Sequence, residues 1–378
     1  MNAQTHFLKN CTKTIWICLV CSLLLLSSPN LSKAQITPSQ FGVSLCGPEF
    51  GLETLPGLLN KNYVYPRADE ITYFNQKGIR LVQLPIRWER IQKRLGGSLD
   101  ADEMREIKNF IINCDKQGLS VIINLHNFGR YRINNTDFII GSAQVPLNCF
   151  KDVWKKLAFE LRDFKNIYAL DLMNEPHDMG TSGWYRAAQI GIEGIREADR
   201  DKAIMVEGEH YSNAECWVQY NDELKYLNDP SYNIIFNAHC YFDFDNSGRY
   251  VRTYDDNHTT EFTGIEKIKP FVDWLKKNYR KGFVGEFGVP KTDRRWLTVM
   301  ENFLEYLTEN NISGSYWAAG PWWRNYPLSI EPVEGKDQPQ MNIYAKYINR
   351  QNNTGNLNAV LYRKEKSVEK ESTGIYAR

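Results

Sequence analysis

Eight short apolar or β-branched runs recur along residues 41–317, and they constrain the fold more than any other feature. They are Phe41–Leu45, Leu81–Leu84, Val121–Leu125, Tyr168–Met173, Ala203–Val206, Ile234–Ala238, Phe283–Glu286 and Gly314–Trp317. Runs of this length and composition are typical of buried parallel strands. Between consecutive runs the chain has room for one helix and two loops. The pattern therefore favours a single-domain α/β fold, the (β/α)8 TIM barrel, over an open doubly wound sheet with fewer units.

Amphipathic helices are predicted between these runs. Asp100 is expected to cap a helix in a capping box with Glu103, and Gly118 is expected to end it. Three apolar stripes at helical spacing support such helices. Their members are Met104, Ile107, Phe110, Ile111 and Cys114; Val153, Trp154, Leu157, Leu161 and Phe164; and Leu297, Met300, Phe303, Leu304 and Leu307. We interpret these stripes as core.

The first 34 residues predict a secretory signal peptide. Lys9 and Lys13 precede an apolar run from Ile15 to Leu26, and the small residues Ser32 and Ala34 flank Lys33 at the expected cleavage site near Ala34–Gln35. The run is too short to span a bilayer comfortably, since a spanning helix needs about 20 residues. We therefore expect an exported protein, secreted or periplasmic, that has no membrane association after cleavage.

The predicted domain organisation is simple. Residues 35–350 are expected to form the barrel domain, and residues 351–378 a polar C-terminal tail. With 46 basic and 45 acidic residues the net charge is +1, which argues against nucleic acid or an anionic membrane as the main partner. We expect a monomer.

Motifs for metals and cofactors are missing from the sequence. No glycine-rich phosphate loop follows a predicted strand, and no two cysteines after the leader have C-x-x-C spacing. We expect neither a metal nor a cofactor. The five cysteines after the leader, which are Cys46, Cys114, Cys149, Cys216 and Cys240, are interpreted mostly as buried free thiols.

Two glutamates follow predicted strands at the end where barrel enzymes carry out catalysis. Glu175 follows the fourth strand and Glu286 the seventh. Glycoside hydrolysis requires two carboxyl groups in one cleft, one protonated to assist the leaving oxygen and the other ionised to attack the sugar. Either glutamate alone would be unremarkable, but their joint placement with His, Asn, Tyr and Trp residues indicates this chemistry.

Five stretches carry a resemblance to a known family. They are Leu84–Arg90, Asn124–Tyr131, Leu172–Met179, Asp245–Gly248 and Gly285–Gly288. Taken in order at barrel spacing, they resemble glycoside hydrolase family 5, and in particular its secreted endo-β-1,4-glucanases, or cellulases. The resemblance extends from about Phe41 to Ile348.

This resemblance implies roles for the two glutamates. Glu175 would be the general acid/base, and Glu286 would be the nucleophile that forms a glycosyl-enzyme. Arg87, His239 and Tyr241 would surround Glu286 and keep it ionised, because a cation and hydrogen bonds to the anion lower a carboxyl pKa.

It also implies a set of residues around the sugar. Asn174 would hydrogen-bond the sugar 2-hydroxyl, His126 would line the −1 subsite, and Trp317 would form its aromatic floor. Asn127 is expected among the substrate-binding residues as well. Trp88, Trp184, Trp217, Trp322 and Trp323 are each either a sugar platform or core, and the sequence leaves both interpretations open.

The chain departs from many relatives at two places. It has Asn124 where many have Asp, and Glu207–Tyr211 where many have Gly-Asn before an aromatic residue. The loop after the fifth strand helps to shape the sugar groove, so these departures affect the expected substrate preference and not the catalytic pair.

The predicted function is a retaining endo-β-1,4-glucanase acting on cellulose-type or mixed-linkage β-glucans by double displacement. Retaining hydrolysis of mannan or xyloglucan is an alternative, because few contacts distinguish the orientation of the C2 hydroxyl. A non-catalytic carbohydrate-binding barrel is an alternative of another class, and the presence of both glutamates argues against it.

Overall fold

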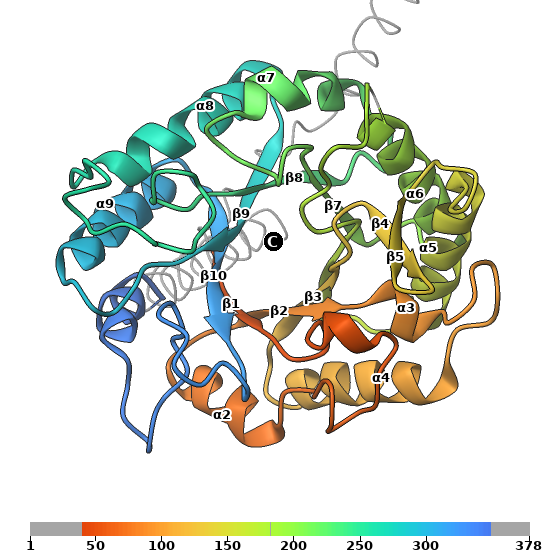
Figure 1. Ribbon diagram of the computed structural model, residues 1–378, viewed down its shortest axis with the longest axis horizontal. Helices are drawn as coiled ribbons and strands as arrows, with labels where there is room; N and C mark the ends of the chain where they lie inside the picture. Colours follow the sequence, from red (N-terminus) through yellow and green to blue (C-terminus); the bar gives the residue numbers. More distant parts are fainter. Residues whose placement is uncertain (1–39, 182, 349–378) are drawn as a thin grey trace, which may run out of the picture. The chain divides into compact units, whose positions relative to one another are not determined.

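The strands form a closed parallel barrel (Figure 1) in the computed structural model, which describes residues 40–181 and 183–348. The barrel strands are β1 (Phe41–Leu45), β2 (Leu81–Ile86), β3 (Ser120–Leu125), β6 (Ile167–Asp171), β7 (Ala203–Glu207), β8 (Ile234–His239), β9 (Lys281–Phe287) and β10 (Ser313–Ala319). They pair in chain order, and β10 closes the barrel on β1. The predicted signal peptide and tail lie outside the described residues.

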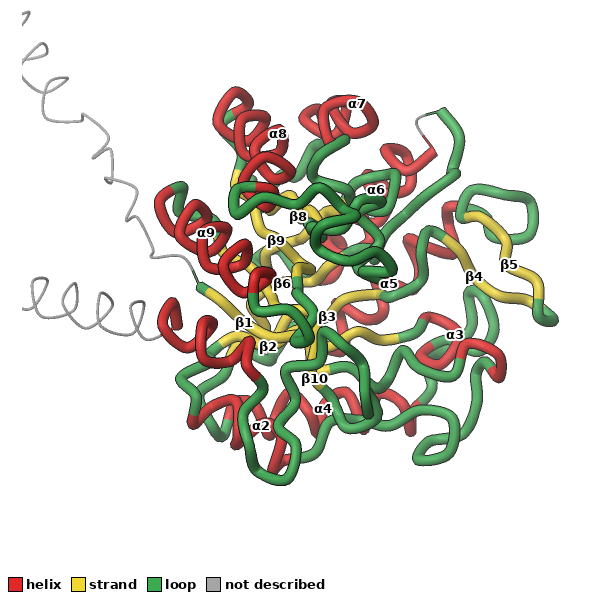
Figure 2. The backbone as a smooth tube through the Cα atoms, turned by 60° about the vertical axis from the view of Figure 1, so that its left-hand side comes forward, coloured by secondary structure: helices red, strands yellow, loops and turns green. Residues whose placement is uncertain are grey.

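Helices surround the barrel, as Figures 1 and 2 show. They are η1 (Leu52–Thr54), α2 (Ala68–Gln76), α3 (Trp88–Ile91), α4 (Ala101–Asp115), α5 (Leu147–Leu161), α6 (Gly183–Ala198), α7 (Trp217–Asn221), η2 (Asp222–Tyr226), α8 (Thr263–Asn278) and α9 (Arg295–Glu309), followed by helical residues 339–348. No helix within the described residues is long and apolar enough to cross a membrane.

The predicted (β/α)8 barrel is confirmed, and all eight predicted strands occur with ends shifted by no more than two residues. A hairpin was not predicted: β4 (Arg130–Ile133) pairs antiparallel with β5 (Thr136–Ile139) outside the barrel. Its turn residues Asn134 and Asn135 have φ values of 49° and 63°, a left-handed pair that asparagine tolerates better than most residues.

Side chains inside the barrel form two layers. Leu81, Ile122, Ala169, Met205, Ile235 and Phe283, from six successive strands, form one apolar cluster. Two residues further along five of these strands lie the buried polar side chains of Gln83, Asn124, Asp171, Glu207 and Asn237. Because successive side chains alternate between the two faces of a strand, the next interior positions bring polar side chains to the carboxyl end of the barrel.

The predicted helix stripes lie against the outside of the barrel as core. Every member of the first stripe is buried, and Gly118 has the left-handed φ of 71° expected after a helix. Phe164 lies three residues beyond the end of α5 and is only partly buried. The predicted capping box is half wrong. The Asp100 side chain accepts the N–H of Glu103, but the Glu103 carboxylate instead accepts the hydroxyls of Tyr63 and Tyr65.

The five cysteines of the described residues are free thiols. Cys46, Cys114 and Cys240 are buried, while Cys149 and Cys216 are partly exposed. The interpretation of mostly buried free thiols is therefore confirmed. Burial raises the pKa of Cys240 above its ordinary value, which makes its thiol a poor nucleophile.

Helices α5 and α6 pack closely at a glycine, and this contact provides a test of the fold. A Cβ added at Gly194 would lie 2.5 Å from the backbone oxygen of Lys151. Alanine is favoured in helices by about 1 kcal/mol, but overpacking costs about 1–3 kcal/mol. We expect Gly194→Ala to lower the free energy of unfolding in urea by about 1–2 kcal/mol. The exposed Arg186→Ala on the same helix should change it by less than about 0.5 kcal/mol.

Candidate active site

The carboxyl ends of the barrel strands bring several predicted site residues to one rim. Arg87 follows β2, His126 follows β3, Glu175 follows β6, His239 ends β8, Glu286 lies in β9 and Trp317 lies in β10. A register shift between Ala238 and His239 pairs His239 with Glu286 and skips Gly285. This irregularity turns the Glu286 side chain into the barrel.

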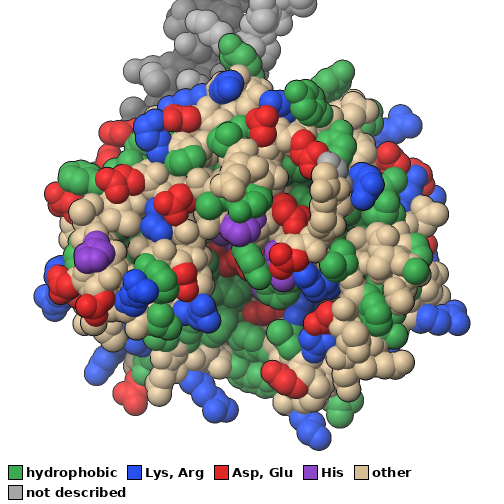
Figure 3. Space-filling model, turned by 45° about the horizontal axis from the view of Figure 1, so that its top comes forward, with side chains coloured by type: hydrophobic (Ala, Val, Ile, Leu, Met, Phe, Trp, Pro, Cys, Tyr) green, Lys and Arg blue, Asp and Glu red, His purple; other side chains and the backbone are tan. Residues whose placement is uncertain are grey.

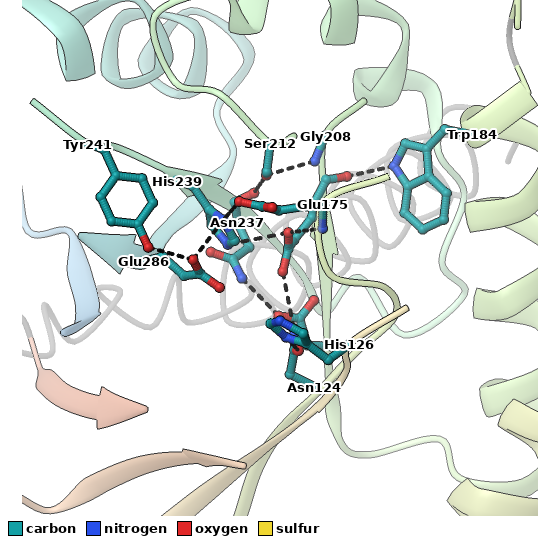
Figure 4. A network of polar contacts seen from close by, with 12 residues as sticks. Asn124, His126, Glu175, Trp184, Gly208, Ser212, Asn237, His239, Tyr241 and Glu286 are labelled. Atoms are coloured by element: carbon teal, nitrogen blue, oxygen red, sulfur yellow. Dashed lines mark hydrogen bonds and ion pairs between the residues drawn. The ribbon is translucent and has the colours of Figure 1, made fainter. Parts of the chain in front are cut away.

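Glu175 and Glu286 meet at His239, as Figure 4 shows. The Nδ1 atom of His239 lies 2.8 Å from Oε1 of Glu175 and 3.5 Å from Oε2 of Glu286. The facing carboxylate oxygens of the two glutamates lie within 4.8 Å of each other. Two carboxyl groups that are far apart in sequence therefore lie on either side of a gap of atomic dimensions.

Tyr241 contacts the same carboxylate oxygen of Glu286 as His239 does. Its hydroxyl donates to Oε2 of Glu286 at 2.7 Å. Burial raises the pKa of Glu286 to about 8, against the lowering effects of His239 and Tyr241, and Glu175 and Glu207 add to the rise. The expected lowering effects of His239 and Tyr241 on the Glu286 pKa are therefore present, but the net pKa is raised because desolvation outweighs them.

His239 carries the positive charge of this group. Burial alone would lower its pKa, but the surrounding carboxylates Glu207, Glu286 and Glu175 outweigh burial and raise the pKa well above its ordinary value. The imidazole is nearly inaccessible to solvent. The site therefore contains one buried imidazolium among several carboxyl groups.

Asn174 presents an amide with no partner. Neither Nδ2 nor Oδ1 of Asn174 has a hydrogen-bond partner among the described residues, although the side chain is buried. Its backbone is held by Leu125 and Phe128. A buried amide without partners is costly, so this geometry favours a ligand that hydrogen-bonds it.

Stacked aromatic rings line the same end of the barrel as the two glutamates. The Trp317 indole stacks on the His126 ring with centroids 5.5 Å apart and planes at 7°, and Trp323 meets Trp317 edge-on at 5.8 Å. Burial lowers the pKa of His126 well below its ordinary value, with the charges of Arg87 and His239 contributing. His126 is therefore a neutral ring whose Nδ1 lies 3.0 Å from Oδ1 of Asn124.

Three of the five additional tryptophans belong to the core. Trp88, Trp184 and Trp217 are at most 2% exposed, whereas Trp322 and Trp323 are partly exposed.

Figure 3 shows a hollow lined by hydrophobic side chains, with acidic and histidine side chains gathered around it.

Arg87 does not pair with Glu286 among the described residues. Its guanidinium donates to the carbonyl oxygen of His126 and lies over the Phe128 ring. Burial lowers the pKa of Arg87 to about 10. The expected contact between Arg87 and Glu286 is thus wrong, and His239 provides the adjacent cation instead.

Asn127 is also engaged elsewhere. Its Oδ1 accepts the N–H of Trp88 at 2.8 Å, and its Nδ2 donates to Oε2 of Glu89 at 2.8 Å and to the carbonyl oxygen of Arg130 at 3.3 Å. Its amide therefore holds the start of α3 and the hairpin together, and the expectation that Asn127 binds substrate stays a prediction.

Sequence reasoning missed a buried acidic group beneath the pair. Asp171 and Glu207 are fully buried, and the Nδ2 atom of Asn124 donates to both of them at 3.0 and 3.1 Å. Strand alternation was the available signal, since Asn124, Asp171 and Glu207 occupy interior positions. The prediction considered only the residues that follow each strand.

Glu175, His239 and Glu286 are also the one set of metal-ligand type atoms within 4.8 Å found in the described part of the chain. Their close approach has another explanation. His239 and Glu175 are in direct hydrogen-bond contact, as are Tyr241 and Glu286. Atoms that face each other at these distances are already engaged, so we assign them to hydrogen bonds.

A pair of facing carboxyl groups at the carboxyl end of a TIM barrel, beside an unpartnered amide and stacked aromatic rings, defines a glycoside hydrolase. The model of the cellulase family, glycosyl hydrolase family 5, matches residues 38–322. The chain belongs to glycoside hydrolase family 5.

Several relatives are similar over most of their length. Endo-β-1,4-glucanase B of Emericella nidulans is 32% identical over 299 residues, covering 78% of this chain and 87% of that protein. The structure of Pseudomonas stutzeri endoglucanase Cel5A in complex with cellobiose is 37% identical with a TM-score of 0.78, and the match covers 82% of this chain and 92% of that chain. The structure of XacCel5A in complex with cellopentaose is 35% identical with a TM-score of 0.77, and the match covers 82% of this chain and 99% of that chain.

The two asparagines provide a test of this assignment. We expect Asn127→Ala to lower the free energy of unfolding by about 1–3 kcal/mol, because buried groups of Trp88 and Glu89 lose their partner. Asn174→Ala is the matched comparison and should leave stability unchanged or raised, since its amide has no partner to lose. Urea denaturation measures both, and equal losses of stability would contradict this account of Asn174.

Proposed function

We propose that Glu286 and Glu175 are the nucleophile and the general acid/base of this retaining endo-β-1,4-glucanase. The observation that carries the proposal is the separation of less than 4.8 Å between their facing oxygens. Inverting enzymes keep their carboxyl groups about 6.5–9.5 Å apart to admit water between them and the sugar, whereas retaining enzymes keep them about 5 Å apart. This geometry supports direct attack by a carboxylate on the anomeric carbon.

The reaction then proceeds in two displacements. Ionised Glu286 attacks the anomeric carbon while protonated Glu175 gives its proton to the leaving oxygen, and a glycosyl-enzyme forms. Glu175 next removes a proton from water, which attacks the same carbon and releases Glu286.

The sugar would lie between the stacked aromatic rings and the unpartnered amide. We assign the 2-hydroxyl to Asn174, whose contact strengthens as charge develops at the anomeric carbon. Trp317 would pack against the pyranose face, and His126 would donate or accept through its remaining ring nitrogen. These placements are supported by burial and by the lack of other partners for the Asn174 amide.

The proposed substrate is a β-1,4-glucan chain. Relatives named endo-β-1,4-glucanase and structures titled as complexes with cellobiose and cellopentaose support it. We further propose a monomer that is exported after cleavage near Ala34, with residues 35–350 as the catalytic domain. A panel of soluble glucans, mannan and xyloglucan with product-length analysis tests the substrate class and endo action.

Chemical rescue by azide assigns the two glutamates separately. With an activated aryl β-cellobioside, Glu286→Gly should lose at least about 10³-fold in kcat, because no nucleophile remains. Azide enters the space and attacks the face that Glu286 occupied, so the product is the α-glycosyl azide. Glu175→Ala should form the glycosyl-enzyme and give the β-glycosyl azide. NMR of the products identifies the anomer, and reversed anomers would contradict the assignment.

The Tyr241 hydroxyl provides a second test through pH. It lowers the Glu286 pKa by hydrogen-bonding the ionised form, so Tyr241→Phe should raise that pKa. The acid limb of kcat/KM, where Glu286 loses its proton, should then move to higher pH. If the acid limb of the variant stays at the wild-type pH or moves to lower pH, the Tyr241 hydroxyl does not lower the Glu286 pKa. Rate measurements on a soluble β-glucan across the pH range determine the limb.

A further inference from the structure

Glu207 is a third carboxylate at the site, at the carboxyl end of β7. Its side chain is wholly inaccessible to solvent. Oε2 of Glu207 accepts the backbone N–H of Glu175 at 2.7 Å, and Oε1 accepts the Asn124 amide at 3.1 Å. Oε2 also lies 3.3 Å from Nε2 of His239. Two hydrogen-bond donors and one imidazole, from β3, the loop after β6 and β8, therefore converge on one carboxylate.

The backbone at Glu175 makes the first of these contacts important. Glu175 has φ of 45°, a left-handed conformation that costs a residue with a side chain energy unless its surroundings hold it. The hydrogen bond from its N–H to Glu207 is one such restraint. The direction in which the Glu175 carboxyl points thus depends on a residue that does not itself reach the sugar.

Glu207 contacts the imidazole of His239 on the side opposite to Glu175 and Glu286. Nδ1 of His239 faces Glu175 and Glu286, while Nε2 faces Glu207. The Nε2 atom makes no hydrogen bond of good geometry, but it lies at ion-pair distance from the Glu207 carboxylate. Glu207 therefore favours the charged form of the ring and fixes the plane in which it meets the catalytic pair.

We propose that Glu207 is the positioning residue of this site, which holds the backbone of Glu175 and the imidazolium of His239 in their reactive arrangement. This inference rests on the proposed roles of Glu175 and Glu286. It assigns a function to the segment after the fifth barrel strand, where the sequence departs from many relatives. A carboxylate suits this position because two of its neighbours donate hydrogen bonds to it and the third is an imidazole at ion-pair distance.

The β7 loop supports this arrangement. Ser212 donates to the carbonyl oxygen of Asn237 at 2.6 Å and accepts the N–H of Gly208 at 2.9 Å, and its carbonyl oxygen accepts the N–H of His239 at 2.8 Å. Trp184 donates its indole N–H to the carbonyl oxygen of Glu207 at 2.6 Å. Figure 4 shows these links between the loop and His239.

The charges around Glu207 set the sign of its effect on pH dependence. Asp171 and Glu175 face it from the β6 side, His239 from β8, and Glu286 from β9. Burial raises the pKa of Asp171 well above its ordinary value, and Glu207 adds to the rise. Removal of a buried negative charge lowers the pKa of every acid and imidazolium beside it.

Glu207→Gln and Glu207→Asp test the proposal together. Glutamine keeps the size but turns an amide N–H toward a donor, so we expect kcat to fall about 10- to 100-fold with little change in KM. Both limbs of the kcat/KM profile should move to lower pH. Aspartate keeps the charge but withdraws the carboxylate, so kcat should fall while the limbs stay in place.

Glu103→Gln is the matched control, since it removes another buried carboxylate that accepts two hydrogen bonds away from the site. It should cost stability in urea without moving the pH profile. Wild-type kcat in either Glu207 variant, or unmoved limbs in Glu207→Gln, would overturn the proposal. If Glu207→Gln does not fold, Glu207→Asp decides it through kcat. Full activity of Glu286→Gly would instead refute the proposed function.

Discussion

The rest of the site depends on one buried imidazole that lies among three carboxyl groups. His239 approaches Glu175 through Nδ1 and Glu207 through Nε2, and Glu286 lies beside the same Nδ1. Buried carboxylates this close to each other cannot all be ionised without a compensating charge. The imidazolium supplies that charge at the centre of the group, which is why the glutamates can lie within one sugar's width and why the Glu286 pKa stays no higher than about 8.

The layered interior of the barrel supports these buried charged groups. An apolar layer from six strands fills the lower part, and the polar side chains above it hydrogen-bond to one another before the catalytic groups are reached. Asn124 and Asn237 both donate to Asp171, so the layer beneath the pair is satisfied in part from within, while the Gln83 amide has no partner among the described residues. Polar groups that bond to each other on rigid strands hold their positions without water.

Much of the fold was predictable because two periodicities are plain in the sequence. Buried parallel strands appear as continuous apolar runs, and the helices between them have stripes at helical spacing. The β4–β5 hairpin was missed, since its four-residue strands lie outside the barrel and have no continuous apolar run. The Glu103 side chain could not be placed from local pattern, because its partners Tyr63 and Tyr65 lie about 40 residues away.

The site was predictable to the extent that its residues follow strand ends. Glu175, Glu286, His239 and Tyr241 come together as the positions of their strands imply. The hydrogen-bond partners of Arg87 and Asn127 were not predictable, because a side chain at a strand end can turn into the cleft or back toward its own loop. Glu207 was overlooked for a related reason: it is the last interior residue of a strand and reaches the site from below.

Three features of the site lower the stability of the folded protein and favour substrate binding or catalysis. The Asn174 amide is buried without a partner, Glu175 has a left-handed backbone, and the Glu286 pKa is raised by burial. Each of these is unfavourable in the free protein, and each is located where a bound sugar or a developing charge would relieve it. Local conflicts of this kind persist only when the surrounding structure fixes them. The closed barrel provides that constraint, because a shift of any one strand end would require movement of both of its neighbours.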